Sequence, residues 1–130
     1  MRAVENGNKI VIGSRYVNGA TAKRKAHRLI ASKVYNKLLD VLFGTNIKDS
    51  QCGFKFWDGA YIRKGVQESN DNHWFFDSEI LIAAKHAGIN VYEMPIEWHE
   101  RKSTHVRLGD IPYFLIAAAA LKFRFVTGRR

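Results

Sequence analysis

The 130-residue sequence is poor in cysteine, proline and acidic residues: it has one Cys, two Pro, and 12 Asp and Glu against 21 Lys and Arg. Because Cys52 is alone, no disulfide can form within the chain, and a zinc site is not expected. No apolar run reaches the roughly 18 residues that a membrane-spanning helix requires. Residues 1–8 lack the apolar centre of a secretory signal. We therefore expect a chain without disulfides, leader segment or spanning helix.

The shortage of acids leaves a formal net charge of +9, which is high for this length. Such a charge indicates an anionic partner, for example a phosphate, a nucleic acid or an acidic membrane surface. With 46% hydrophobic and 25% charged residues, the composition is that of a globular protein. A chain of this length can bury a real core. We therefore expect residues 1–130 to form a single domain.

Basic residues gather around one predicted helix. Apolar spacing predicts a helix over residues 21–43, with Thr21 as its N-cap and Gly44 as its stop. Residues 13–37 hold seven Lys and Arg and no acid, although a helix start disfavours each positive charge by about 0.3–1 kcal/mol. One interpretation is a solvated basic face. We favour an anion site, because cations and free amides at a helix start bind phosphate. Its candidates are Arg15, Arg24, Lys25 and Arg28.

The run DSQCGFKFW at residues 49–57 places several polar groups between apolar ones. If the run is extended, alternate residues share one face. That polar face consists of Asp49, Gln51, Gly53 and Lys55. Gly53 also suggests a bend or a close approach by another group. The pattern fits either an edge strand with one face in water or a binding surface.

Acids and aromatics meet at residues 74–81, WFFDSEIL. Asp77 or Ser78 can cap a helix over residues 78–87, with Glu79 as a favourable acid in its first turn. Capping does not explain the aromatic residues, which begin at Trp74. An aromatic wall beside carboxylates suits a sugar, and desolvation can raise a carboxylate pKa towards that of a working base. We therefore weigh Asp77, supported by Glu79, as a catalytic carboxylate that acts as a base or orients the acceptor, against the capping alternative.

Two further elements are expected nearer the C-terminus. Residues 89–98 alternate as a strand, in which Pro95 forces an edge position or a bulge. Residues 111–125 are apolar and end among Lys and Arg. A helix of that length is too short to span a bilayer, but residues 111–126 could lie in the plane of a lipid surface. The alternative is a terminal helix packed on the sheet.

Four stretches, taken together and in order, resemble family 2 glycosyltransferases, closest to the dolichyl-phosphate glucosyltransferase and polyprenyl-phosphate mannosyltransferase branch. They are IVIGSRY at 10–16, the run at 49–57, WFFDSEIL at 74–81 and VYEMPIEW at 91–98. The similarity covers the chain from about residue 8 onward. It implies an α/β fold: part of an A-type, Rossmann-like domain, with a mixed sheet flanked by helices. Where the family often has Gly-Ser-Lys-Val, this chain has His105 in place of the lysine, which makes His105 a weak phosphate candidate.

The resemblance further implies an inverting transfer of glucose or mannose from a nucleotide sugar to a polyprenyl or dolichyl phosphate, on the cytoplasmic side of a membrane. Neither the donor-binding half of this family nor its Asp-x-Asp motif precedes Ile10. We therefore expect the acceptor-side part of the enzyme, inactive alone, and a divalent metal (Mg or Mn) whose ligands lie outside this chain. The implied catalytic residues are Asp77 and Glu79; the acceptor and phosphate residues are Arg15, Arg24, Lys25, Arg28, Asp49, Gln51, Gly53, Lys55, Trp74 and His105.

The acceptor class bears on the role of Asp77. A phosphate monoester has a second pKa of about 6, so a polyprenyl phosphate is already largely anionic near neutral pH. It needs cations for positioning more than it needs a base, and Asp77 would then orient rather than deprotonate. Two other functions stay open: a basic nucleic-acid-binding domain, and a non-catalytic membrane-surface protein.

Overall fold

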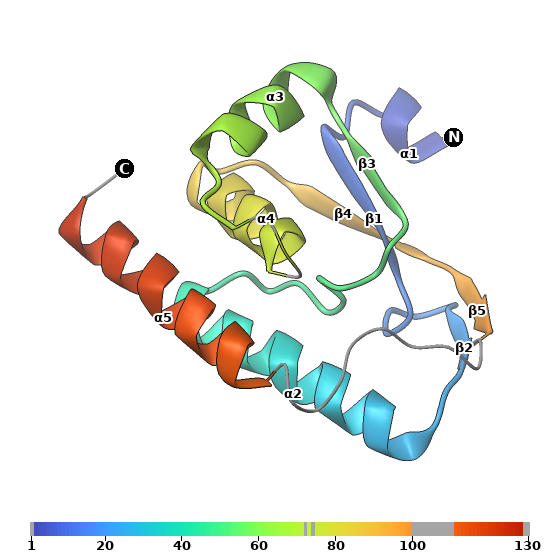
Figure 1. Cartoon of the computed structure of the whole chain (residues 1–130). Helices are drawn as coiled ribbons and strands as arrows, with labels where there is room; N and C mark the ends of the chain where they lie inside the picture. Colours follow the sequence, from blue (N-terminus) through green and yellow to red (C-terminus); the bar gives the residue numbers. More distant parts are fainter. Residues whose placement is uncertain (1, 72, 74, 100–110, 129–130) are drawn as a thin grey trace.

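The computed structural model describes residues 2–71, 73, 75–99 and 111–128, which form an α/β arrangement of helices around a mixed sheet (Figure 1). The predicted class, a mixed sheet flanked by helices, is confirmed. In chain order the elements are α1 (Arg2–Glu5), β1 (Ile10–Ser14), β2 (Thr21–Lys23), α2 (Ala26–Phe43), β3 (Lys55–Trp57), α3 (Gly59–Glu68), α4 (Phe76–His86), β4 (Val91–Pro95), β5 (Glu97–His99) and α5 (Ile111–Thr127).

Strand β1 is the centre of the main sheet, whose order is β3-β1-β4. It runs antiparallel to β3, with Ile10 opposite Trp57, and parallel to β4, with Ile10 opposite Val91. All five residues of β1 are buried, as its unbroken apolar start predicts for a strand covered on both faces. Strands β2 and β5 form a separate parallel pair.

Helix α4 lies between the sheet and a layer made of α2 and α5 (Figure 1). Towards the sheet, Leu81 and Ala84 of α4 pack with Ile10 and Ile12. Towards the other side, Ile82 joins the cluster formed by α2 and α5. Because α4 is buried on both sides, its first turn has a fixed position relative to both layers. Within the described part of the chain, no helix is both long and apolar enough to cross a membrane.

The helix predicted over residues 21–43 is correct at its end and wrong at its start. Gly44 terminates α2 in the left-handed region at φ 62, and its N–H bonds the carbonyl of Asp40. Thr21, however, is not the N-cap: its N–H donates to the carbonyl of Ile96 at 3.1 Å, and β2 pairs with β5. The N-cap is Lys25, which has no side-chain capping bond. A strand partner distant in sequence thus captures the segment that helical spacing alone had extended.

Two predicted strands differ from the structure. Of residues 49–57, only Lys55–Trp57 form a strand, because the earlier residues form a turn. The alternating polar face predicted from Asp49 to Lys55 is therefore wrong. The strand predicted over 89–98 is divided at Ile96 into β4 and β5. Pro95 ends β4, an edge strand of the main sheet, as its missing N–H predicts.

Candidate active site

A buried ion pair lies at the end of β1. Asp49 is 0% exposed; its carboxylate accepts from Nε of Arg15 at 2.7 Å, from Nη2 at 2.6 Å and from the Arg15 backbone N–H at 2.9 Å. Burial works to lower the pKa of Arg15, but the hydrogen bonds and charge of Asp49 raise it overall. Such a bidentate pair is strong and fixed in direction. Asp49 therefore acts by holding Arg15.

The turn that carries Asp49 is fastened by side chains from two other elements. Glu93 of β4 accepts the backbone N–H groups of Lys48 and Asp49, each at 3.0 Å. The amide oxygen of Asn36 in α2 accepts from Ser50 N–H at 2.9 Å and from its hydroxyl at 2.6 Å. These side chains bind backbone N–H groups that would otherwise pair with a neighbouring strand. The segment therefore forms a turn rather than a strand.

A second ion pair joins β3 to the first turn of α4. Lys55 Nζ donates to Asp77 Oδ2 at 2.7 Å and also to the carbonyl of Cys52. The Lys55 side chain is 4% exposed, whereas that of Asp77 is 46% exposed. The N-cap of α4 is Phe75 and has no side-chain cap bond, so the capping alternative is wrong for Asp77 and Ser78. The Asp77 carboxylate is therefore held by a buried lysine and is still partly open to solvent.

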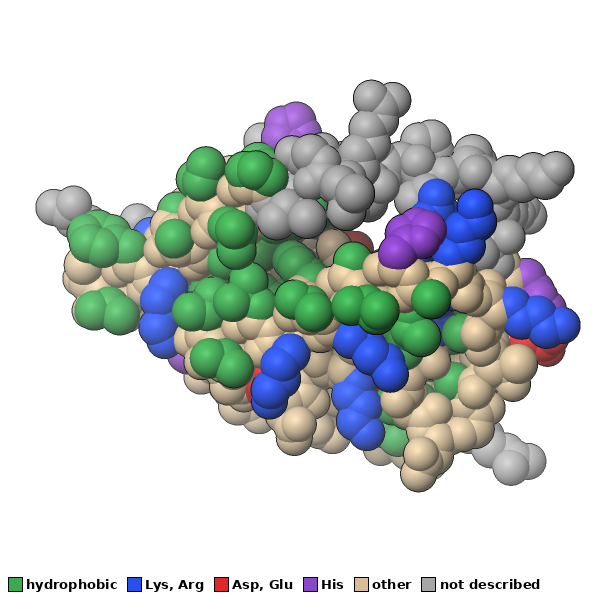
Figure 2. Space-filling view, turned by 90° about the horizontal axis from the view of Figure 1, so that it is seen from below, with side chains coloured by type: hydrophobic (Ala, Val, Ile, Leu, Met, Phe, Trp, Pro, Cys, Tyr) green, Lys and Arg blue, Asp and Glu red, His purple; other side chains and the backbone are tan. Residues whose placement is uncertain are grey.

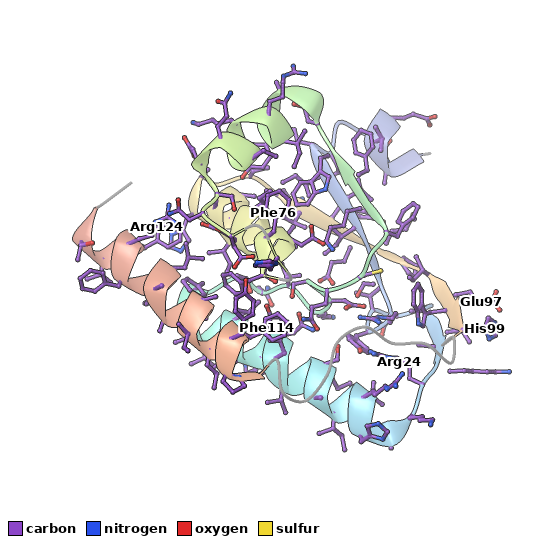
Figure 3. All side chains as sticks on the ribbon, in the orientation of Figure 1. Arg24, Phe76, Glu97, His99, Phe114 and Arg124 are labelled. Atoms are coloured by element: carbon purple, nitrogen blue, oxygen red, sulfur yellow. The ribbon has the colours of Figure 1, made fainter. Side chains whose placement is uncertain are left out.

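Glu79 faces away from Asp77, because side chains two positions apart in an α-helix point in directions that differ by roughly 200° around the helix axis. Its carboxylate, 7% exposed, accepts from the Ser69 hydroxyl at 2.7 Å, from Asp71 N–H at 3.1 Å and from Arg124 Nη1 at 2.7 Å. Figure 3 shows Arg124 reaching from α5. Glu79 borders a cavity of about 730 Å³ between α3, α4 and α5 that Asp77 does not line. These contacts anchor three elements, and a catalytic role for Glu79 stays an untested prediction.

Tyr16 is a meeting point for cations that the sequence analysis did not single out. Its hydroxyl accepts from Arg24 Nη1 at 2.7 Å. The Arg15 guanidinium lies 5.5 Å from the centre of the Tyr16 ring and 5.6 Å from that of Trp98, and Lys33 Nζ lies 5.9 Å from Tyr16. The available signal was position alone, since Tyr16 directly follows Arg15. The aromatic rings collect the cations at this end of the sheet.

Tyr35 is a second residue that the sequence analysis missed. Its hydroxyl lies 2.9 Å from the Ser78 hydroxyl, and its ring packs edge-on against Phe114 at 5.2 Å. Burial raises the pKa of Tyr35, so the group stays neutral. Since Ser78 directly follows Asp77, this contact ties α2 to the start of α4. Helical spacing along α2 does not reveal a hydroxyl partner on another helix, so this contact is not evident from the sequence.

The basic residues at the start of α2 and Asp77 in the first turn of α4 belong to different elements. Arg28 is half-buried and Lys25 is exposed. Figure 3 shows Arg24 beside the start of α2, and Phe76 at the start of α4. A cavity of about 270 Å³ lies along α2 and includes Tyr16. Neither of the two cavities described is lined by Arg28 or Asp77.

The remaining predicted site residues are placed as follows. Gln51 is half-buried in the turn, and Gly53 is exposed at a bend. Of the two alternatives predicted for Gly53, the bend is present. No other described residue approaches it closely, since a Cβ on Gly53 would meet nothing within 4 Å. Trp74 and His105 lie outside the described residues. Within the ranges that the structure describes, no three His, Cys, Asp or Glu side chains come together to hold a metal ion.

Comparison with known proteins gives matches to named enzymes. No family model matches the chain. The chain is 35% identical over 96 residues to the glycosyltransferase AglD of Haloferax volcanii, covering 74% of this chain and 15% of that protein. It is 39% identical over 103 residues to the dolichyl-phosphate beta-glucosyltransferase of Saccharomyces cerevisiae, covering 77% and 31%. It is 31% identical over 102 residues to the polyprenol monophosphomannose synthase of Mycolicibacterium smegmatis, covering 77% and 38%. The chain thus spans between 15% and 38% of the length of these relatives.

Proposed function

The chain is a glycosyltransferase homologue, related to the dolichyl-phosphate beta-glucosyltransferases and polyprenol monophosphomannose synthases, and on this premise we propose that it supplies the acceptor side of such an enzyme. The full reaction is the inverting transfer of glucose or mannose from a nucleotide sugar to a polyprenyl or dolichyl phosphate. The chain forms part of an A-type domain whose donor-binding half lies elsewhere, and it is inactive alone. The relatives' names and the shares of their lengths that match support this division.

The transfer is a single displacement. A phosphate oxygen of the acceptor attacks the anomeric carbon and forms the new C–O bond. The bond to the nucleoside diphosphate breaks on the opposite face and leaves with its electron pair. Because the attacking oxygen is already largely anionic near neutral pH, no proton has to be removed. Asp77, held by buried Lys55 at 2.7 Å, orients the reacting groups.

The cations of the chain neutralise the acceptor phosphate. Arg15 is fixed by Asp49 and lies against Tyr16, whose hydroxyl also accepts from Arg24. Arg28 follows in the first turn of α2, where helix amides add to the positive potential. Cations already held in place lose little conformational freedom when an anion binds, which favours affinity.

The other partners proposed are a membrane surface, on its cytoplasmic side, and a divalent cation. The cation normally accompanies the donor diphosphate and stabilises its charge. Because no metal-binding cluster occurs among the described residues, no step that we assign to this chain runs through a metal. Peripheral attachment is supported by the apolar helix α5, which ends among basic residues.

The observation that carries the proposal is the Lys55–Asp77 pair, in which a 4% exposed lysine holds a 46% exposed carboxylate. The test supplies the chain with the donor-binding region of a relative and follows labelled sugar from UDP-glucose or GDP-mannose into polyprenyl phosphate. Asp77→Asn and Arg28→Ala are each expected to lower transfer by about 10–100-fold, which corresponds to about 1.4–2.7 kcal/mol. Glu68→Gln and Arg63→Ala, on the exposed side of α3, are the matched controls.

Two outcomes contradict the proposal. Transfer that is unchanged by both site variants would remove the assigned roles of Asp77 and Arg28. Lipid binding without any transfer, with the donor region folded and nucleotide bound, would identify a non-catalytic membrane-surface protein instead.

A further inference from the structure

The core side of α2 contains a buried amide. Asn36 is 4% exposed and shares its helix face with Leu39 and Phe43, which fill the core. Figure 2 views the molecule from the side of α2 and α5 and shows apolar and basic side chains at that surface. Burying an amide costs free energy unless its hydrogen bonds are made. The partners of Asn36 therefore show what its place in the core achieves.

Both ends of the Asn36 amide are used. Its Nδ2 donates to the Ser32 carbonyl at 2.8 Å within α2. Its Oδ1 accepts from the Ser50 backbone N–H at 2.9 Å and from the Ser50 hydroxyl at 2.6 Å. A backbone N–H can only donate and a backbone carbonyl can only accept, so these partners determine which way the amide points. Since Ser50 is 3% exposed, the contact is a buried link between α2 and the turn that contains Asp49.

The link continues from Ser50 to Arg15. Ser50 directly follows Asp49, whose carboxylate accepts two hydrogen bonds from the Arg15 guanidinium and one from the Arg15 backbone. A planar peptide group joins Asp49 to Ser50, so a shift of Ser50 moves Asp49 as well. The Asp49 side chain is fully buried and that of Arg15 is 8% exposed, which leaves neither much room to compensate. A displacement at Asn36 therefore reaches Arg15.

Asn36 also belongs to the helix that carries another cation assigned to the acceptor phosphate. Arg28 lies eight positions before Asn36, which is about 12 Å along a regular helix. A single helix thus bears Arg28 and holds the turn that sets Arg15. Glu93 holds the same turn from β4, by accepting the N–H groups of residues 48 and 49, but β4 contains no Lys or Arg. Glu93 ties the turn to the sheet, whereas Asn36 ties it to the helix that bears the cations.

We propose that Asn36 is a positioning residue, which joins Arg15 and the cations of α2 into one anion-binding unit. It does so by holding the Asp49 turn against α2, and it does not touch the anion itself. Cations held at a fixed separation lose little freedom when an anion binds to both. The inference deepens the proposed function and rests on it for the identity of the anion, the phosphate monoester of a lipid acceptor.

The first test is nuclear magnetic resonance of the isotopically labelled full chain, observed at the Arg15 Nε–H group, which donates to Asp49 at 2.7 Å. In Asn36→Ala we expect this signal to shift and its proton to exchange faster with water, because the Asp49 turn is no longer held against α2. Ser50→Ala keeps the backbone N–H and loses only the hydroxyl bond to Asn36. It should change the Arg15 signal in the same direction but less, and it decides the question if Asn36→Ala fails to fold.

The second test measures the affinity of the same chains for dimethylallyl phosphate, a water-soluble isoprenoid monophosphate, with dimethylallyl alcohol as the comparison ligand. We expect the dissociation constant for the phosphate to rise about tenfold in Asn36→Ala, because charge-assisted bonds to phosphate require the cations in place. Ser50→Ala should raise it less. The alcohol should not bind measurably to any of the chains.

The matched control is Asp58→Ala. Asp58 accepts the backbone N–H groups of Ala60 and Tyr61, each at 3.1 Å, and caps α3. Its loss therefore also removes the acceptor of two hydrogen bonds, but these belong to α3 rather than to the Asp49 turn. Urea unfolding should show lower stability for both Asp58→Ala and Asn36→Ala. Only Asn36→Ala should change the Arg15 signal and the phosphate affinity, whereas a merely structural role would affect the two variants alike.

Three results overturn the inference. The first is an Arg15 signal in Asn36→Ala that equals that of the unaltered chain. The second is an equal change of that signal in Asp58→Ala, which would indicate general loosening. The third is a changed Arg15 signal with an unchanged dissociation constant for the phosphate. Failure of the proposed function is distinguishable, because the unaltered chain would then not bind dimethylallyl phosphate, and the Arg15 signal would still decide whether Asn36 positions Arg15.

Discussion

Two acids in the first turn of α4 have opposite surroundings. Glu79 is 7% exposed and is enclosed by donors from Ser69, Asp71 and Arg124. Asp77 is 46% exposed and is held by Lys55. A carboxylate whose oxygens are already occupied contributes to stability, whereas one that is oriented and still open can meet a ligand. Burial and partners, rather than closeness in sequence, therefore separate the anchoring acid from the candidate site acid.

The largest expected effect is on the free energy of unfolding, when the enclosed acid Glu79 is removed. Glu79→Ala removes the carboxylate that accepts from Arg124 and from the donors at residues 69–71. Removing one partner of a buried ion pair costs about 3–5 kcal/mol. We expect the lower end, because Arg124 is 27% exposed. Urea unfolding measures the loss, with Glu68→Ala on exposed α3 as the control; a change below about 0.5 kcal/mol would contradict the anchoring role.

A smaller effect on stability, but a clear one on activity, is expected on the open side. Lys55→Met keeps the length of the side chain and removes the charge that holds Asp77. The Cys52 carbonyl also loses a donor, so the free energy of unfolding should fall by about 1–2 kcal/mol. In the transfer assay with a donor-binding region, activity should fall by about 10–100-fold, because Asp77 is no longer oriented.

Lys64→Met, on exposed α3, is the matched control for this prediction. If Lys55→Met loses stability but keeps full transfer, the pair is structural and the contrast between the two acids disappears.

The smallest expected effect is a loss of folding stability at alkaline pH. Burial raises the pKa of Tyr35, which bonds Ser78 beside Asp77, and raises that of Tyr61 to about 12. Above the ordinary tyrosine pKa of about 10 the unfolded chain loses protons that the folded chain keeps. Stability from both groups is thus full below pH 10 and is lost as pH rises towards 12. Urea unfolding at several pH values should show this fall, and Tyr35→Phe should make it shallower; a fall unaffected by Tyr35→Phe would contradict the assignment.

The sequence predicted helices correctly where an apolar pattern or a helix-ending glycine marked them. The apolar run at 111–125 predicts α5, and Gly44 ends α2 in the conformation expected of it. The prediction failed where side chains distant in sequence capture the backbone. Glu93 and Asn36 bind the amides of residues 48–50, and Ile96 binds Thr21. No local pattern contains those partners.

The candidate site was predictable as a set of residues but not as a set of pairs. Asp49, Lys55 and Asp77 were all chosen from the sequence. Their partners depend on how β1, β3 and α4 come together: Asp49 binds Arg15, and Lys55 binds Asp77. Because the sequence does not show how the elements pack, Glu79 was grouped with Asp77. The partners of Glu79 in fact come from residues 69–71 and from α5.

The most direct test of the account is a nuclear magnetic resonance titration of the isotopically labelled chain in bicelles with a short polyprenyl phosphate, and with the matching polyprenol as control. We expect saturable shifts of the Asp77, Lys55 and Arg28 signals with the phosphate and none with the alcohol. Shifts confined to α5, or equal for both lipids, would contradict the claim that these residues receive a lipid phosphate.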